Sequence, residues 1–350
     1  MSSKIGSPIR SLSDSINAAT RPAHTKLNKL VISRLQLALP PQADDASQYV
    51  SGLLHITPIY IAFESLWRVI LKLPGTPEAH DSGKDGNAGA VCVPVGLRLN
   101  NRLNAHCGPI VDSRIDALLT KLYFERLQRS QALQQDLTSL TGWSHCTLAE
   151  QLDNASKSPI LNDFLTDIET SVRKRPHVLL AYAWVLYMAL FSGGRFIRAS
   201  LENIYPAFWI PASAQQPTPA TLAGFTITDV QPLSFFRFNT PEGGEDIKQE
   251  FKKRLLESEY CLTALEREEV IEEARRIFEY MIQLVGELDD ICGTDKEAAE
   301  ARLLSLRSRD SVVVEKERRR HFEQTARKTT AERTRSWVEK AIIKCGSNAK

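Results

Sequence analysis

Apolar residues recur at helical spacing along most of the chain, and this pattern predicts an all-α fold. No stretch alternates apolar and polar residues for more than four positions, so no β-strand is expected. Ser11 or Ser13 is expected to cap the first helix and Thr263 the last one. The predicted helices cover Leu12–Leu39, Ala46–Leu73, Ser113–Thr141, Thr147–Leu152, Ser158–Arg173, Gly244–Glu259 and Leu265–Ile291.

A further predicted helix, over Leu179–Leu201, carries the most informative break in the pattern. It begins as an apolar run, reaches Ser192, Gly193 and Gly194, and ends in a basic turn. Adjacent glycines inside a helix each cost about 1 kcal/mol relative to alanine. They occur where the backbone bends or where a flat group lies against it, and also at loosely packed points of an ordinary core helix. The pattern alone leaves these explanations open.

Two segments differ from the helical body in composition. Residues 74–112 collect Gly, Pro, Asp and Ser, which is typical of a surface loop. Residues 294–350 hold 15 Lys and Arg against 9 Asp and Glu, a net charge of +6 in a chain whose total is +2. We therefore expect one helical domain over residues 1–293, with a loop insert at 74–112, and a basic tail over 294–350. The tail is expected to be a solvated helix or disordered, and a docking arm for an acidic protein or an anionic membrane is the alternative.

The six cysteines include no Cys-x-x-Cys pair, so neither a zinc site nor a disulfide framework is indicated. Reduced cysteines are typical of intracellular proteins, and we expect a soluble, cytoplasmic protein. No apolar run reaches the ~18–20 uncharged residues of a membrane span, and the N-terminus has no signal-peptide pattern. Neither a membrane span nor a nucleic-acid partner is expected.

Several segments resemble the haem oxygenase family, and they follow the family's order over roughly Leu12–Ile291. None of them is specific alone, but their order over most of the chain is hard to reach by chance. The resemblance implies a multihelical bundle that holds haem between a proximal helix and a kinked distal helix. The segments are LSDSINAATRPAHTKLN at 12–28, IYIAFE at 59–64, LYFERLQRSQALQQDL at 122–137, SGGR at 192–195, FFRF at 235–238 with IKQEFKKRL at 247–255, and VIEEARRIFEYMIQL at 270–284.

The resemblance implies which side chains serve the iron and the distal side. His24 stands at the position of the proximal iron ligand, whereas a lone histidine on an apolar helix face is more often an ordinary core residue. Gly193 and Gly194 stand where the family's distal helix bends over the haem. Tyr187 and Ser192 are then the side chains left to order a distal water. The expected catalytic residues are therefore Tyr187, Ser192, Gly193 and Gly194.

Haem carries two carboxylates on one edge, and these propionates need cations at the mouth of the pocket. The resemblance places Arg21, Lys248 and Lys252 there, although solvated helix charge explains each of them equally well. Phe278 is expected to contact the haem, together with the backbone of Gly193 and Gly194.

The chain also departs from the family at polar positions. The family's distal aspartate, which organises a proton-donating water, corresponds to Leu190, and a glutamate partner of the proximal histidine corresponds to Asn28. Other family positions hold Asn17, Leu186, Ala189 and Met281 in place of a basic residue, an arginine, a glycine and an asparagine. We therefore expect a drier distal side than the family norm.

Two functions are consistent with this pattern. The first is a haem oxygenase, for which haem is both cofactor and substrate and an NADPH-dependent flavoprotein reductase supplies electrons; the products are biliverdin, CO and iron. The second is a non-catalytic haem-binding protein for sensing, storage or delivery. A di-iron oxidase is disfavoured, because its metals need inward-facing carboxylates and histidines from several helices and Leu179–Ser200 supplies none.

Deletion of residues 294–350 is expected to leave haem affinity and thermal stability nearly unchanged, because the tail matches no pocket-forming part of the family. Thermal unfolding of the full and shortened chains, each with a haem titration, checks this. A fall of ~5 °C or more in the melting temperature would mean that the tail packs on the helical domain.

Overall fold

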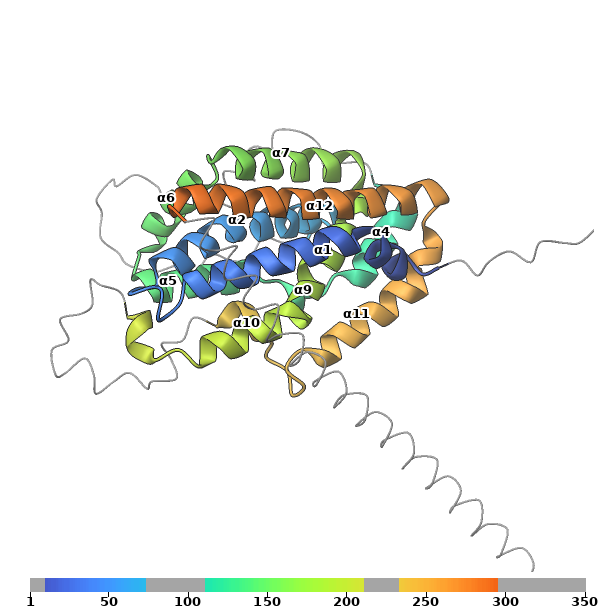
Figure 1. Cartoon of the computed structure of the whole chain (residues 1–350). Coiled ribbons are helices and arrows are strands. Elements are labelled where there is room, and N and C mark those ends of the chain that lie inside the picture. The colour runs from blue at the N-terminus through green and yellow to red at the C-terminus, as the bar shows by residue number, and fades with distance from the viewer. Residues whose placement is uncertain (1–9, 74–110, 211–232, 295–350) are drawn as a thin grey trace, which may run out of the picture. The chain divides into compact units, whose positions relative to one another are not determined.

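The computed structural model describes residues 10–73, 111–210 and 233–294, in which all regular secondary structure is helical and no β-strand occurs (Figure 1). The all-α prediction is confirmed. The α-helices are α1 (Leu12–Leu37), α2 (Ser47–Ile70), α4 (Ser113–Leu122), α5 (Ser130–Thr141), α6 (His145–Ala155), α7 (Pro159–Lys174), α8 (Leu179–Tyr182), α9 (Met188–Phe191), α10 (Gly193–Glu202), α11 (Glu245–Ser258) and α12 (Ala264–Ile291). Short 3-10 turns are η1 (Glu125–Leu127), η2 (Pro176–Val178), η4 (Pro206–Trp209), η7 (Ser234–Phe236) and η8 (Glu259–Cys261), and η3 (Ala183–Tyr187) is a π-helical turn.

The long helices α1 and α12 run along each other, and α2 packs against α5 and α7 behind them (Figure 1). The core side of α2 is almost continuously apolar, and Tyr60, Phe63 and Trp67 are each at most 2% exposed. A helix that is apolar on most of its faces is buried rather than half-solvated. This makes α2 the centre of the bundle, with the other helices packed around it.

Capping side chains begin α1 and α12 at the positions that the sequence predicts. Ser11 caps α1, and its hydroxyl accepts a hydrogen bond from the backbone N–H of Asp14 at 3.1 Å. Thr263 and Glu266 form a reciprocal capping box at the start of α12. A bidentate ion pair between Arg34 of α1 and Asp289 of α12 then ties the far ends together, with its shortest N–O distance 2.7 Å.

The prediction of one helix over Ser113–Thr141 is wrong. The chain leaves helical geometry after α4, and Tyr123 and Phe124 are extended before α5 begins. The buried carboxylate of Glu64 accepts the backbone N–H groups of Arg129 and Ser130 at 2.7 and 3.0 Å. A carboxylate from another helix therefore caps α5 and fixes a break that the spacing of leucines does not reveal.

The chain divides into Met1–Thr294 and Asp295–Lys350, and the second unit lies outside the described residues, as does 74–110 of the predicted insert. By length and composition, α2 is apolar enough to cross a membrane, and so is the bent pair Pro176–Phe191 and Gly193–Glu202. In α2, 72% of the apolar window is buried inside the protein, and core helices pass the same test.

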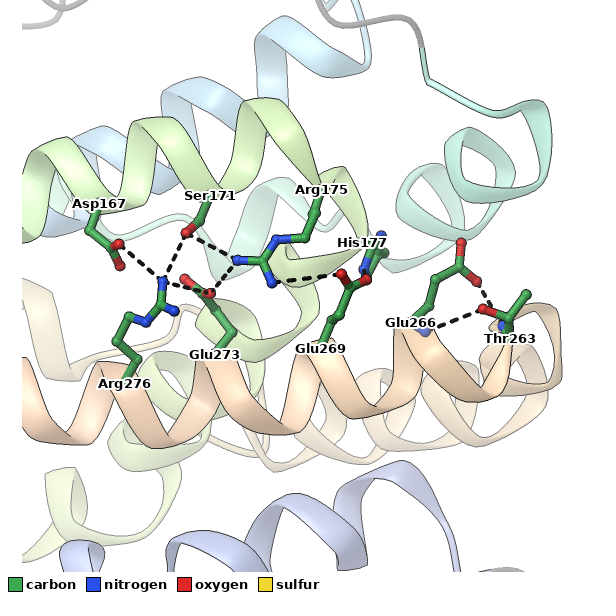
Figure 2. Close-up of polar contacts among 9 residues, drawn as sticks. All are labelled: Asp167, Ser171, Arg175, His177, Thr263, Glu266, Glu269, Glu273 and Arg276. Carbon is green, nitrogen blue, oxygen red and sulfur yellow. Dashed lines mark hydrogen bonds and ion pairs between the residues drawn. The ribbon is translucent and has the colours of Figure 1, made fainter.

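A ladder of charged side chains joins α7 and the turn that follows it to α12 (Figure 2). Its most buried member is Glu273, whose side chain is 1% exposed and pairs with Arg175 at 3.3 Å and Arg276 at 3.8 Å. The hydroxyl of Tyr182 donates to the same carboxylate at 2.6 Å. Burial raises the pKa of Glu273, and the hydrogen bond from Tyr182 opposes this shift. The ladder thus fixes α8, where the long apolar run of the chain begins.

Replacing Glu273 with alanine is expected to lower the free energy of unfolding by roughly 1–3 kcal/mol, because it leaves the buried hydroxyl of Tyr182 without its acceptor and removes one partner of two partly exposed arginines. Urea denaturation measures this. Glu272→Ala is the matched control, since its side chain is 57% exposed and its ion pair with Arg275 is worth at most about 1 kcal/mol. Equal losses in the two variants would contradict the importance of the ladder.

Candidate functional site

His24 lies near the middle of α1, and its ring meets the edge of the Phe278 ring of α12 at 5.7 Å between centroids. The residue is exposed. Within the part of the chain that the structure describes, no hydrogen bond to its ring nitrogens is found, so either nitrogen is open to an incoming ligand. Phe278 is 6% exposed and belongs to the core, so α12 supports the imidazole from one side.

The second wall of the site is the run from Pro176 to Glu202, which bends by 41° between Phe191 and Gly193. Ser192 stands at the bend with φ −111° and ψ −84°. Its backbone N–H turns to the carbonyl of Ala189 at 3.3 Å, and its hydroxyl donates to the carbonyl of Met188 at 3.0 Å. The serine side chain thereby satisfies a carbonyl that the break leaves without its helical partner.

The two glycines after the bend face in different directions. A Cβ atom on Gly193 would lie 3.7 Å from Oδ1 of Asn28, one turn after His24 on α1, and among the described residues no other non-local atom lies within 4 Å of it. A Cβ atom on Gly194 would instead meet Phe236 at 3.4 Å and Leu190 at 3.5 Å. Gly193 is therefore the glycine that presents bare backbone toward the helix of His24, and Gly194 permits close packing behind the bend.

Hydrogen bonds from other helices hold the π-helical turn η3 that precedes the bend. The hydroxyl of Tyr60 on α2 donates to the carbonyl of Leu186 at 3.0 Å. The indole N–H of Trp184 donates to Oδ1 of Asn17 on α1 at 3.1 Å. Single π-turns inside helices are frequent at functional sites. This one links the segment from Pro176 to Glu202, called the distal run below, to the helix that carries His24.

Tyr187, which is expected to order a distal water, has a hydroxyl that is bound to protein groups. Its hydroxyl is buried, donates to Glu64 at 3.0 Å and accepts from Gln128 Nε2 at 3.4 Å. Burial raises the pKa of Tyr187 well above its ordinary value, with the nearby Glu64 carboxylate acting in the same direction. Tyr187 therefore anchors the distal run to α2, and Ser192 is the expected catalytic side chain that lies exposed at the bend.

The predicted cations lie around the same two walls. Arg21 is exposed on α1, one turn before His24. Lys252 of α11 is exposed and lies over the ring of Trp184, with 5.8 Å from Nζ to the centroid. Lys248, one turn earlier, donates to both oxygens of Glu245 at 3.2 Å.

The positions at which the chain departs from its resemblance are mostly apolar in the structure as well. Leu190 and Leu186 are 7% and 4% exposed, and Met281 is packed against the core. Among the described residues, no group of three or more His, Cys, Asp or Glu side chains could hold a metal ion.

These residues fit haem. A histidine nitrogen without a protein partner is the proximal ligand that haem iron takes in many proteins. Across from α1, the one non-local atom of the described residues near a Cβ on Gly193 is the flexible end of Asn28, which could move to admit a flat ring. Basic residues on α1 and α11 can pair with carboxylates at the ring edge.

Some residues of this arrangement were not found from the sequence. Glu64 and Trp184 position the distal run, and Glu245 pairs with Lys248. A single glutamate within the apolar stretch IYIAFESLW is a signal that would have identified Glu64 as a buried, partnered carboxylate. Glu245 lies in a helix rich in both charges, where nothing distinguishes it.

A model of one protein family, described as "Heme oxygenase", matches residues 109–287. Heme-binding protein HMX1 of Saccharomyces cerevisiae is 24% identical over 290 residues, covering 81% of this chain and 77% of that protein. Human heme oxygenase 1 is 27% identical over 198 residues, covering 55% of this chain and 59% of that protein. The match thus spans little more than half the length of the human relative.

Solved structures show the same fold at lower identity. Heme oxygenase-2 from Synechocystis sp. PCC 6803, in complex with heme and NO, aligns with a TM-score of 0.52 at 13% identity, over 84% of this chain and 92% of that chain. Heme oxygenase 2 from Chlamydomonas reinhardtii, without heme, aligns with a TM-score of 0.51 at 18% identity, over 79% of this chain and 97% of that chain. At these identities the likeness concerns the fold alone.

Proposed function

Because the chain belongs to the haem oxygenase family, we propose that it binds haem through His24 and opens the haem ring oxidatively to biliverdin, CO and iron. The observation that carries this proposal is that the exposed His24 lies on α1 one turn before Asn28, the residue that the bare backbone of Gly193 faces beyond the bend. Bound haem would supply the iron that activates oxygen, and its own ring would be the substrate.

The residues of this chain would orient the ring from three sides. His24 Nε2 or Nδ1 would ligate the iron, with Phe278 limiting rotation of the imidazole. Arg21, Lys248 and Lys252 would pair with the propionates. Arg21 and Lys252 are exposed, whereas Lys248 already donates to Glu245. Asn28 supplies a neutral amide near the proximal helix, so the histidine would be a weaker donor to iron than one with a carboxylate partner.

Proton delivery on the distal side would depend on Ser192 and on backbone groups. The Ser192 hydroxyl donates its proton to the Met188 carbonyl. The hydroxyl oxygen of Ser192 can therefore still accept a hydrogen bond from a water. Leu190 and Leu186 offer no polar group, and Tyr187 is bound to Glu64. We propose that catalysis uses this single-hydroxyl route with electrons from an NADPH-dependent flavoprotein reductase.

The test is a single-turnover assay on the full chain. Ferric haem is added, the complex is purified, and a reductase with NADPH and oxygen is supplied while the visible spectrum and the CO in the headspace are followed. Loss of the haem Soret band with stoichiometric biliverdin and CO is the expected result. Intact haem after complete reduction, under conditions in which a human heme oxygenase control turns over, would contradict the proposed activity.

A haem complex that keeps its histidine ligand but never opens the ring would instead assign a haem-binding role. This alternative differs from the oxygenase only in the products, so the same assay decides between the two.

A further inference from the structure

Cations from two helices converge on one carboxylate beside the distal bend. Glu245, in the first turn of α11, forms an ion pair with Arg195 of α10 at 2.5 Å. Both of its oxygens also accept from Lys248 Nζ at 3.2 Å. Gln249 Nε2 completes the set with a hydrogen bond to Oε1 at 2.7 Å. Arg195 directly follows Gly194, so this carboxylate ties α11 to the distal run immediately after its bend.

The backbone before Glu245 leaves it little freedom to move. Gly244 has φ +90°, and a Cβ atom there would lie 2.8 Å from the rings of both Phe191 and Phe238. Those two rings stack at 4.5 Å between centroids, and Phe191 is the last residue before the bend. The start of α11 is thus pressed against the distal run, and this packing holds Glu245 within reach of both cations.

The Glu245 side chain stays ionised in this arrangement. Partial burial alone would raise its pKa, but hydrogen bonds from Gln249, Lys248 and Arg195 hold the pKa at about 2. At any pH above about 4.5 the group is therefore a full negative charge. Its position in the first turn of a helix also favours that charge.

We propose that Glu245 is an internal competitor for the carboxylates of haem: it pairs with Lys248 and Arg195, and a haem propionate that binds at Lys248 competes with it for the donors of that ammonium group. The inference rests on the proposed haem-binding function, in which Lys248 is one of the propionate partners. The exchange replaces one carboxylate by another at the same ammonium group, so haem gains only the difference between the two ion pairs. Glu245 therefore lowers the haem affinity that the cations alone would give.

Equilibrium titration with ferric haem tests this on three forms of the full chain: wild type, Glu245→Gln and Glu250→Gln. The glutamine keeps the shape of residue 245 but lacks its charge, and we expect haem to bind about fivefold more tightly, on the scale of released exposed ion pairs. Glu250 lies on the same helix and pairs only with Arg254 among the described contacts, so Glu250→Gln should bind as wild type does. Added salt should shrink the difference between Glu245→Gln and wild type.

A second probe isolates the propionates. With the dimethyl ester of haem, whose carboxylates are blocked, Glu245→Gln and wild type should bind equally. If Glu245→Gln fails to fold, Glu245→Asp serves instead. Its shorter carboxylate should pair less well with Lys248 and Arg195, so haem should bind more tightly than to wild type. Thermal unfolding checks that the fold is kept.

The outcomes separate this inference from the proposed function. If Glu245→Gln binds haem no more tightly than wild type, or more weakly, the competition does not exist and Glu245 only positions its cations. If wild type binds no haem at all, the proposed function itself fails. An equal gain for haem and for its dimethyl ester would also overturn the inference, because the effect would not pass through the propionates.

Discussion

The His24→Ala variant is expected to lose histidine ligation of haem iron completely while it keeps the helical fold. His24 is exposed and its ring meets the Phe278 ring at 5.7 Å between centroids, so removing the largely solvated imidazole costs little packing. Without it, the described part of α1 offers no other histidine that could replace the ligand. The Soret position and the electron paramagnetic resonance spectrum of the ferric complex report the ligand directly.

His145→Ala is the matched control, because this exposed histidine lies at the start of α6 and plays no part in the proposed site. Its haem spectrum should equal that of wild type. Added imidazole should restore a nitrogen-ligated spectrum to the alanine variant of His24. An unchanged spectrum in that variant before any imidazole is added would remove His24 from the iron and leave the proposed function without its carrying observation.

The sequence predicts the long helices well because their ends depend on local chemistry. Ser11 caps α1 and the Thr263–Glu266 box starts α12, and both signals lie within one turn of the boundary that they set. The prediction of one continuous helix across α4 and α5 is wrong for the opposite reason. It depends on Glu64, which reaches it from α2, and no pattern within Ser113–Thr141 encodes that contact.

The same distinction holds for the candidate site. His24 and the glycine pair are identified by motifs, and the structure brings Gly193 to within one helical turn of His24 along α1. The direction of a side chain is a tertiary property. Tyr187 lies in the motif that suggests a distal role, yet its hydroxyl points to Glu64. No sequence pattern identifies Glu245, because its ion pair with Arg195 forms only where α10 and α11 come close in the fold.

Leu190 stands where the resemblance to the family implies a distal aspartate, and we expect this residue to limit how protons reach the proposed site. Its side chain is 7% exposed, and its Cβ lies 3.5 Å from the point where a Cβ on Gly194 would stand. A leucine at this place can neither accept a hydrogen bond from water nor give up a proton. A positioned general acid typically contributes ~10²–10⁴ to a rate, so its absence should limit ring opening.

Leu190→Asp is therefore expected to raise biliverdin formed per bound haem, by up to the ~10²-fold lower end of that range, because a carboxylate there can hold a proton-donating water. The change has a cost, since a carboxylate in an apolar position lowers the free energy of unfolding by roughly 1–3 kcal/mol unless it is hydrated. Leu190→Asn is the matched control: its amide can hold a water but has no negative charge to anchor it, so a smaller gain is expected. Single-turnover assays with identical reductase and oxygen measure all three forms. If wild type already turns over briskly and the aspartate gives no gain, protons reach the site through Ser192 or backbone-held water, since the Tyr187 hydroxyl is bound to Glu64.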